Sequence, residues 1–401
     1  MERVGAIGVP VRAEVDDDGR VITDGVELEW WVGADDGWHI PAEDTTTRHR
    51  RPSAAPVFET AVRVPGGDVV QRVFGVATPS GKGAVVAEVE NTSRVACSIA
   101  VVVKTRGGGV GRLGGATLEL GGERRLQLSR RPRLWAAGDD VREVVCSGRA
   151  RDDTEPAWQS GVDVALLVPG PPRTTFRVVH TVEELDPLEL PSAEAVTRGC
   201  EQQLDRAMRT ELPEPFQSQI DAARADLLLS SPSSDVVAAL EDWGFDDEAV
   251  SAWGQLGFRE RRGARRRSRS EVSINALAET RDDPARFLLA MRELLVHEDS
   301  RDVALLPGFP AEWLGQHLAV HDAPLHRGRL SFAVRWHGAR PALLWDAPTG
   351  VALRAPALDA TWSSSHPVGE SLLASPPATL LPMGELGART GERVRDPGSF
   401  G

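Results

Sequence analysis

The spacing of apolar residues changes near residue 191, and this change limits the folds that the chain can adopt. Up to residue 190, short runs either alternate apolar with polar residues or are continuously apolar, and clusters of Gly, Pro and Asp separate them. This pattern is typical of β-strands. In 58–64, for example, Phe58, Thr60, Val62 and Val64 fall on one face. About ten such strands at regular spacing predict a sandwich of two antiparallel sheets.

From 191 to 300 the apolar period becomes helical, with breaks at Pro213, Pro215 and Gly244. Apolar stripes recur there, one formed by Ile220, Ala223 and Leu227 and another by Ala249, Val250, Trp253 and Leu256. After 300 the pattern returns to strands. We therefore expect an α+β multidomain chain made of a β-sandwich, a helical region, a β-rich C-terminal unit and a disordered tail, over 1–190, 191–300, 301–375 and 376–401.

Composition narrows the range of partners and compartments. The 401 residues carry a net charge of −13, and an acidic chain is a poor match for nucleic acid. No apolar run reaches the roughly 18 residues that a membrane helix needs, and the N-terminus shows no signal peptide. The three cysteines are widely separated in the sequence, and we expect them to be reduced thiols. We expect a cytoplasmic protein without a membrane partner; its oligomeric state stays open.

One basic run departs from the acidic background. Residues 259–269 contain seven arginines and a single acid, Glu260. The run follows a helical segment, where cations favour the negative end of the helix dipole. An exposed arginine-rich helix end or loop is the simpler interpretation, and binding of nucleic acid or another anion is the alternative.

The segment 328–347 alternates strictly. Leu330, Phe332, Val334 and Trp336 lie on one face, and a turn at 337–341 leads to a return strand. This predicts a hairpin with an apolar core face. The functional alternative is a sugar-binding platform, in which an aromatic ring stacks on a pyranose and polar neighbours bind its hydroxyls. That platform would use Arg335, Trp336 and His337.

Three histidines upstream of this hairpin raise the question of a metal site. His317 and His321 are four residues apart, and His326 follows. The segment reads as a strand, along which four residues span roughly 13 Å. This is too far for one ion, so we expect no metal and no cofactor.

Acidic residues gather around Trp243. Glycoside hydrolysis by inversion needs two carboxylates about 6.5–9.5 Å apart, one as acid and one as base. The candidates for these roles are Glu241, Asp242, Asp247 and Glu248, with Trp243 as a sugar contact. The alternative is that acids at 246–248 cap a helix and that Glu241 and Asp242 are solvated.

A second aromatic and acidic group lies at 30–39, where a turn containing Gly33, Asp35 and Asp36 separates two strands. We expect at least one of the paired tryptophans Trp30 and Trp31 to be core, because they point to opposite faces. Trp38 and His39 are candidates for a carbohydrate-contacting loop.

Two stretches resemble a known family. The segments "VELEWWVGADDGWHIPAED" and "VFETAVRVPGGDVVQRVF" resemble the N-terminal sandwich of bacterial glucoamylase-like proteins. The segment "LLPGFPAEWLGQHLAVHDAPLHRGRLSFAVRWHG" resembles the β-rich end of six-hairpin glycosidases. The two matches cover roughly the first 190 and the last 80 ordered residues. They imply a glycosidase-related chain, but neither contains the family's catalytic acids.

The middle of the chain departs from this family. A toroid of twelve helices needs roughly 180–200 residues, whereas 191–300 holds 110. We therefore expect a toroid remnant, and a protein that binds carbohydrate with weak or no catalysis. The alternatives are an inverting glycoside hydrolase with a rebuilt cleft, and a sandwich scaffold that binds other proteins.

Overall fold

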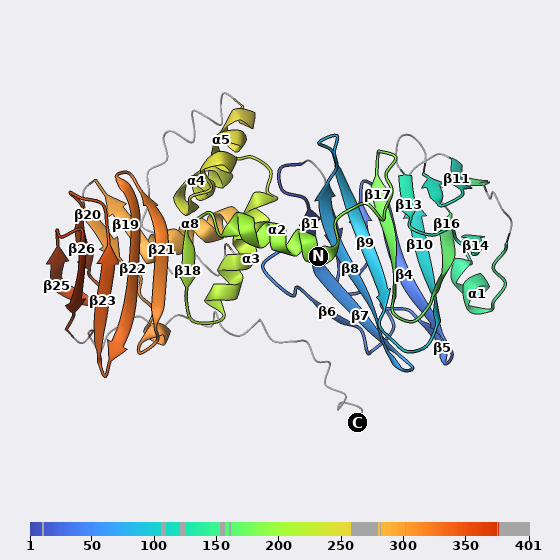
Figure 1. Ribbon diagram of the computed structural model, residues 1–401, viewed down its shortest axis with the longest axis horizontal. Helices are drawn as coiled ribbons and strands as arrows, with labels where there is room; N and C mark the ends of the chain where they lie inside the picture. Colours follow the sequence, from blue (N-terminus) through green and yellow to red (C-terminus); the bar gives the residue numbers. More distant parts are fainter. Residues whose placement is uncertain are drawn as a thin grey trace. The chain divides into compact units, whose positions relative to one another are not determined.

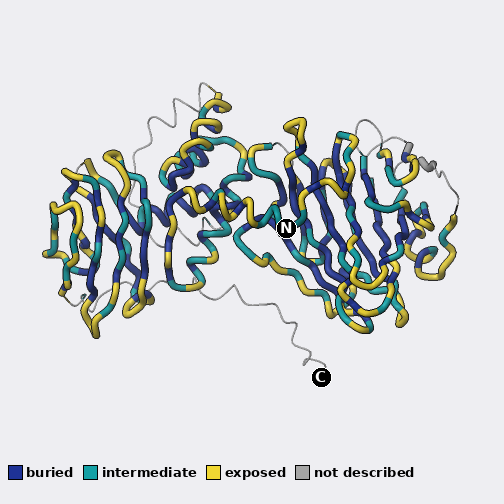
Figure 2. Tube along the Cα trace, viewed as in Figure 1, coloured by how far each residue is buried: buried dark blue, intermediate teal, exposed yellow. Residues whose placement is uncertain are grey.

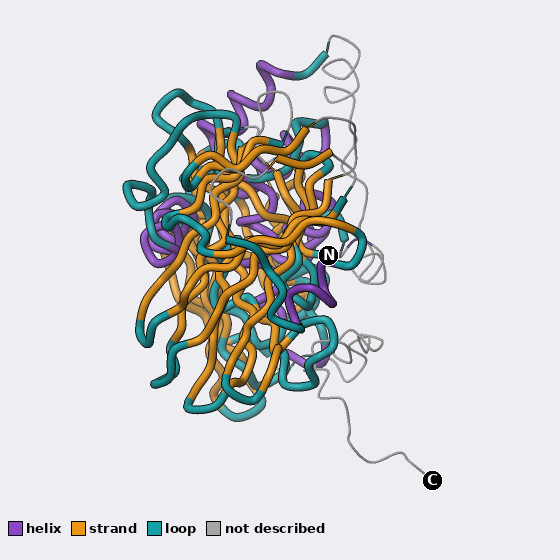
Figure 3. The backbone as a smooth tube through the Cα atoms, turned by 90° about the vertical axis from the view of Figure 1, so that its right-hand side faces the viewer, coloured by secondary structure: helices purple, strands orange, loops and turns teal. Residues whose placement is uncertain are grey.

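The computed structural model describes residues 1–9, 12–105, 110–120, 125–152, 157–159, 162–257, 280, 282–300, 302–374 and 376. The described chain is mostly strand, drawn in orange in Figure 3, with fewer helices in purple. It divides into two compact units, Met1–Glu201 and Gln202–Gly401. Each unit has its own pair of sheets (Figure 1).

The first unit contains two antiparallel sheets, which confirms the predicted N-terminal sandwich. The first sheet has, in spatial order, β1 (Glu2–Gly5), β2 (Arg12–Val15), β3 (Val21–Thr23), β4 (Val26–Ala34), β10 (Cys97–Thr105), β16 (Asp163–Gly170) and β14 (Leu134–Gly138), with β5 (Gly37–His39) paired to β4. The second has β15 (Ala157–Gln159), β11 (Val110–Gly114), β12 (Thr117–Glu119), β13 (Arg125–Leu128), β17 (Thr174–Thr181), β9 (Gly83–Asn91), β8 (Gly67–Ala77), β7 (Phe58–Val64) and β6 (Arg48–Arg50). The sequence underestimated the number of strands because several have only three or four residues, too few to show a period.

Alternation along these strands builds the core between the sheets. On β7, Phe58, Thr60, Val62 and Val64 are all buried, as the sequence predicted. The middle of the central strand β10 is buried on both faces, because its odd-numbered residues join the core and Ala100 and Val102 belong to a second cluster that includes Val141 and Val145 of helix α1 (Val141–Cys146). Figure 2 shows the central strands as dark blue and many of the turns as yellow.

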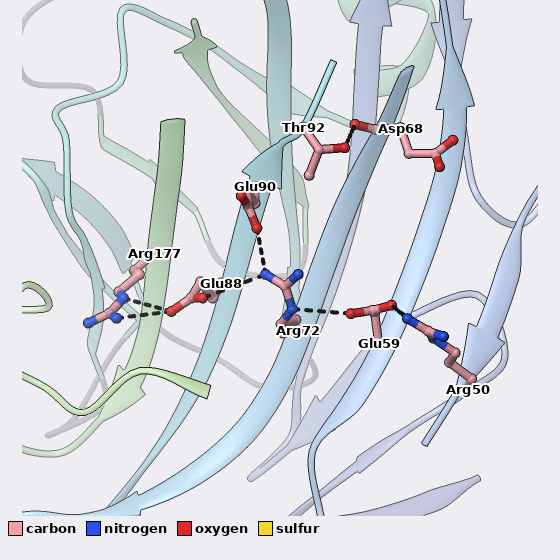
Figure 4. A network of polar contacts seen from close by, with 8 residues as sticks. All are labelled: Arg50, Glu59, Asp68, Arg72, Glu88, Glu90, Thr92 and Arg177. Carbon is pink, nitrogen blue, oxygen red and sulfur yellow. Dashed lines mark hydrogen bonds and ion pairs between the residues drawn. The ribbon is translucent and has the colours of Figure 1, made fainter. Parts of the chain in front are cut away.

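The outward face of the second sheet carries a charge row, a line of side chains with alternating charge that crosses five neighbouring strands (Figure 4). Each member stands directly opposite the next in the strand register, in the order Arg50, Glu59, Arg72, Glu88 and Arg177. Cross-strand pairs of opposite charge stabilise a sheet.

Arg72 is the centre of the charge row. Its Nε donates to Glu59 at 3.2 Å, and its Nη1 donates to Glu90 at 2.7 Å and lies 3.9 Å from Glu88. Arg177 ends the row, with Nε and Nη2 both 3.0 Å from one oxygen of Glu88. The third guanidinium nitrogen of Arg177 donates to the carbonyls of Pro187 and Leu190. The row therefore also holds the segment that follows the last strand of the sandwich.

The second unit contains a five-stranded and a four-stranded sheet. The five-stranded sheet has β18 (Arg209–Glu211), β21 (Leu318–Leu325), β22 (Gly328–His337), β23 (Arg340–Asp346) and β26 (Val368–Leu372). The four-stranded sheet has β19 (Val296–Asp299), β20 (Asp302–Leu305), β24 (Ala352–Ala355) and β25 (Asp359–Ser364). Trp345 on β23 and Trp362 on β25 join the sheets edge to face, with ring centroids 5.2 Å apart. The predicted hairpin at 328–347 is confirmed as β22 and β23.

The helices begin and end largely where the sequence indicates. They are α2 (Ala193–Leu204), α3 (Phe216–Leu228), α4 (Ser234–Trp243), α5 (Asp246–Gln255) and α8 (Pro284–Leu295), with the short η1 (Ala311–Trp313) after them. Ser233 and Asp283 cap α4 and α8 through side-chain oxygens, and Pro284 is at the first position of α8. That these helices derive from a toroid stays a prediction.

Two details of the helical region were wrong in the sequence prediction. Strand β18 lies between α2 and α3, within a segment predicted to be entirely helical. On α5 the buried residues are Ala249 and Ala252, whereas Val250 is 75% exposed. Ala252 was not in the predicted stripe, because alanine gives little apolar signal beside tryptophan and valine.

A buried arginine joins three elements of the second unit. Arg292 on α8 is 5% exposed, and it donates to the carbonyls of Asp242 on α4, Val296 on β19 and Pro324 on β21. The Asp242 carbonyl lies in the last turn of α4, where backbone carbonyls lack a partner within the helix. Arg292 thus links α8 to α4, β19 and β21 through backbone acceptors.

Two predictions fall outside the described residues. The arginine run 259–269 is one, and the disordered tail 376–401 is the other, apart from Pro376. Among the described helices, none is long and apolar enough to cross a membrane.

Replacing Arg72 with Met should destabilise the sandwich by about 2 kcal/mol, because the buried Glu88 and the half-buried Glu59 and Glu90 would lose their shared cation. The matched control is Arg50→Met at the 68% exposed end of the row, which should cost about 0.5 kcal/mol or less. Urea unfolding measures both. Equal effects at the two positions would contradict a central role for Arg72.

Gly244 should be intolerant of a side chain. It ends α4 at φ +81°, and an added Cβ would lie 3.2 Å from Pro324 Cγ. Gly244→Ala should therefore lower the stability of the second unit by about 1–2 kcal/mol. Gly254 on α5 has open space around its Cα, so Gly254→Ala should raise stability by about 0.5 kcal/mol. Calorimetry of both variants tests whether the two changes have opposite signs.

Candidate functional site

The four predicted carboxylates lie at the ends of two consecutive helices. Glu241 and Asp242 belong to the last turn of α4, and Asp247 and Glu248 to the first turn of α5. Asp247 is 82% exposed and forms an ion pair with Arg206 at 3.0 Å, while Glu248 accepts a hydrogen bond from Gln203. Acids in a first helical turn also favour the helix dipole. The catalytic role of the four acids stays a prediction.

Trp243, the expected sugar contact among these acids, is a core residue. Its side chain is fully buried, and the indole nitrogen donates to the carbonyl of Leu288 on α8 at 2.9 Å. The ring therefore has no exposed face on which a sugar could stack.

The residues predicted at the tip of the C-terminal hairpin alternate in direction. Trp336 is half-buried, donates to the carbonyl of Gln316 at 2.9 Å, and has its ring 6.4 Å from that of Phe309. Arg335 and His337 are exposed on the opposite face of the same strand. The structure thus does not bring these three residues to one surface.

Trp38 and His39 do come together with acids, around strand β5. The His39 ring is held at both nitrogens, with Nδ1 2.7 Å from Asp44 and Nε2 3.0 Å from Asp36. The half-buried Trp38 ring lies over Gly33, where an added Cβ would come within 3.0 Å of it. Trp38 also packs against the cluster formed by Trp31 and helix α1.

The two carboxylates favour a charged imidazole at position 39. Burial by itself lowers the pKa of His39, but the hydrogen bonds to Asp36 and Asp44 outweigh it, so the pKa is raised above its ordinary value. For Asp44, burial acts to raise the pKa, and hydrogen bonds from Thr46 and His39 outweigh it, so the pKa is lowered. Because both ring nitrogens are engaged, His39 braces the 36–44 loop and has no nitrogen left for a sugar hydroxyl.

The histidines considered for metal binding make separate pairs. His321 lies 3.1 Å from Glu211, and His326 lies 3.0 Å from Glu298. Across the described residues, no three His, Cys, Asp or Glu side chains are grouped so that they could hold a metal ion.

Sequence reasoning missed a pocket of about 400 Å³ at the margin of the sandwich. It lies where β14, the edge strand of the first sheet, meets β11 of the second. Its lining residues are Leu113, Arg131, Pro132, Arg133, Leu134, Trp135 and Asp152. The signal in the sequence was "RRPRLW" at 130–135, which combines arginines with a tryptophan.

Backbone hydrogen bonds hold the Trp135 pocket together. Trp135 and Arg151 exchange two of them, each 2.8 Å long, so that the segment around Asp152 lies beside β14. The amide of Arg133 donates to the carbonyl of Leu167 at 2.9 Å. The Arg151 guanidinium lies 5.7 Å from the centre of the Trp135 ring, within the range of a cation–π contact.

The lining of the pocket combines two kinds of surface. Leu113, Leu134 and Trp135 supply apolar contact, and 8% of Trp135 stays exposed. Arg131 and Arg133 supply N–H donors, and the Asp152 carboxylate supplies acceptors. Such a pocket suits a small ligand with an apolar face and polar edges.

Comparison with known proteins does not place the chain in a family. No known family matches the sequence, and no curated protein does so either. Among solved structures, a bacterial glucoamylase complexed with acarbose is similar over 62% of this chain, with 9% identity and a TM-score of 0.44. The chain spans 48%, about half, of the length of that enzyme.

Two glycosidases of family GH92 show a weaker likeness. An alpha-mannosidase from Bacteroides thetaiotaomicron covers 55% of this chain and is itself covered over 29%, with 8% identity and a TM-score of 0.20. A second GH92 glycosyl hydrolase covers 73% of this chain and is covered over 46%, with 12% identity and a TM-score of 0.24. None of the scores reaches 0.5, so none of these likenesses shows a shared fold.

Replacing His39 with Gln should destabilise the sandwich more at pH 5 than at pH 9. A raised pKa means that the contribution of His39 is fully present below its ordinary value of 6.5 and is lost as pH rises through the raised one. Asp44, with a lowered pKa, keeps its contribution at pH 5, above its ordinary value of 3.8. Urea unfolding at the two pH values measures the difference. An equal loss at both would contradict a charged His39.

Proposed function

We propose that this chain is a glycosidase-related protein that binds carbohydrate without efficient hydrolysis, and that the Trp135 pocket is its binding site. The observation that carries the proposal is the lining of that pocket, which places an indole, two arginines and a carboxylate around about 400 Å³. A sugar ring presents apolar C–H faces and a rim of hydroxyls. The indole and leucines match the faces, and Arg131, Arg133 and Asp152 match the rim.

The contacts of the predicted acids support binding rather than hydrolysis. An inverting enzyme needs one carboxyl group protonated and another free to activate water. Asp247 is 82% exposed and is paired with the Arg206 guanidinium at 3.0 Å, and Glu248 already accepts a hydrogen bond from Gln203. Trp243 is fully buried beside them. On this proposal Asp247 and Glu248 link α5 to Arg206 and Gln203, at the end of α2.

The Trp135 pocket is also remote in sequence from those acids. It is built by 113–152, whereas Glu241 to Glu248 belong to the second unit. On this proposal the sandwich retains recognition, and the helical region is a toroid remnant without the family's cleft. Trp38 and Trp336 are then structural tryptophans.

Saturation-transfer NMR of the full chain with a panel of α- and β-linked oligosaccharides tests the proposal. We expect transfer to at least one ligand and no new anomeric signals after a day. Arg133→Gln should weaken that transfer, because the pocket loses a donor group on its rim. The control is Arg94→Gln, an exposed arginine outside the pocket lining, which should leave the transfer unchanged.

Each other outcome points to a different function. Turnover that is lost on Glu241→Gln or Asp247→Asn would replace the proposal with the hydrolase. Transfer that Arg133→Gln leaves intact would remove the Trp135 pocket as its source. The absence of saturation transfer to any oligosaccharide of the panel would contradict carbohydrate binding. It would favour a role of the sandwich as a scaffold that binds other proteins.

A further inference from the structure

We infer that the ligand of the Trp135 pocket is a saccharide with a negatively charged group, such as a uronic acid. This inference rests on the proposed function and specifies its substrate class. Two of the residues that line the pocket are arginines and one is an acid. A third arginine, Arg151, lies against the ring of Trp135. The chain has a net charge of −13, so its composition alone would not predict a pocket with more arginines than acids.

Arg131 and Arg133 line the same pocket from the segment just before β14. Pro132 between them is buried, while both arginines are exposed. The hydrogen bond from the Arg133 amide to Leu167 fixes this segment to β16. Two guanidinium groups are thus presented together at the rim.

Arg133 differs from the arginines of the charge row. Arg72 and Arg177 are committed to Glu59, Glu88 and Glu90. In the described part of the chain, no carboxylate pairs with the Arg133 guanidinium. A guanidinium group binds a carboxylate or a sulfate through two parallel N–H donors, a stronger contact than a neutral hydroxyl provides.

The apolar part of the lining distinguishes a charged sugar from a simple anion. Leu113, Leu134 and Trp135 add a surface that phosphate or sulfate alone would not use. A uronic acid has both features, because its ring offers C–H faces and its C5 substituent is a carboxylate. The Asp152 carboxylate would then accept a hydrogen bond from a hydroxyl group of the sugar ring.

Calorimetric titration of the full chain with an oligouronate and with its methyl ester tests the inference, since the two ligands share stereochemistry and differ in charge. We expect the acid to bind about tenfold more tightly at low salt, with the difference shrinking in 0.5 M NaCl. Arg131→Gln and Arg133→Gln should each weaken binding of the acid about three- to fivefold and leave the ester nearly unchanged. Arg94→Gln is the control for both ligands.

Further ligands test separately whether binding requires the negative charge, the saccharide ring or both. Binding of a sulfated oligosaccharide that depends on Arg133 supports the inference as well. Equal binding of acid and ester would overturn the charge requirement and leave carbohydrate binding intact. Equal binding of citrate would overturn the saccharide requirement. If neither these ligands nor any neutral oligosaccharide binds, the proposed function itself fails. Circular dichroism of each variant confirms that these exposed substitutions leave the fold unchanged.

Discussion

Strand register is the constraint on which the sandwich depends. A slip by one residue would turn every side chain of a strand to the opposite face, so Glu59 or Arg72 would enter the apolar core. The charge row opposes such a slip, because each of its members stands directly opposite a partner of opposite charge. Burial of apolar residues supplies most of the stability. The charge row makes the native register more stable than registers shifted by one residue. Through Arg177 it also holds the segment that follows the last strand of the sandwich.

The second unit uses a different means of holding its parts. Helix α8 is linked to its neighbours by a buried side chain. Arg292 donates hydrogen bonds to three carbonyls, on α4, β19 and β21. Trp243 adds a donor to the same helix, α8. In this unit, therefore, Trp243, which the sequence suggested as a sugar contact beside acids, is part of the packing.

The Trp135 pocket arises where the strands of the sandwich stop pairing. An edge strand has neighbours on one side only, so β14 leaves side chains at a margin that neither sheet covers. Arg131 and Arg133 precede this strand, and Asp152 arrives from a segment that is bound to Trp135 through its neighbour Arg151. The pocket that we propose for recognition is thus built by the sandwich unit alone.

The sequence by itself determined the elements that depend on local pattern. Alternation predicted the sandwich and the hairpin at 328–347, and Gly244 marked the end of a helix, because these signals act within a few residues. Tertiary structure decided which faces are covered and which side chains meet. The sequence suggested Trp243 as a ligand contact, but in the fold it is buried and bonded to α8. Asp152 lies near Trp135 because its neighbour Arg151 pairs with Trp135, which no local periodicity reveals. Periodicity identifies an apolar face, but only the packed chain determines what lies against it.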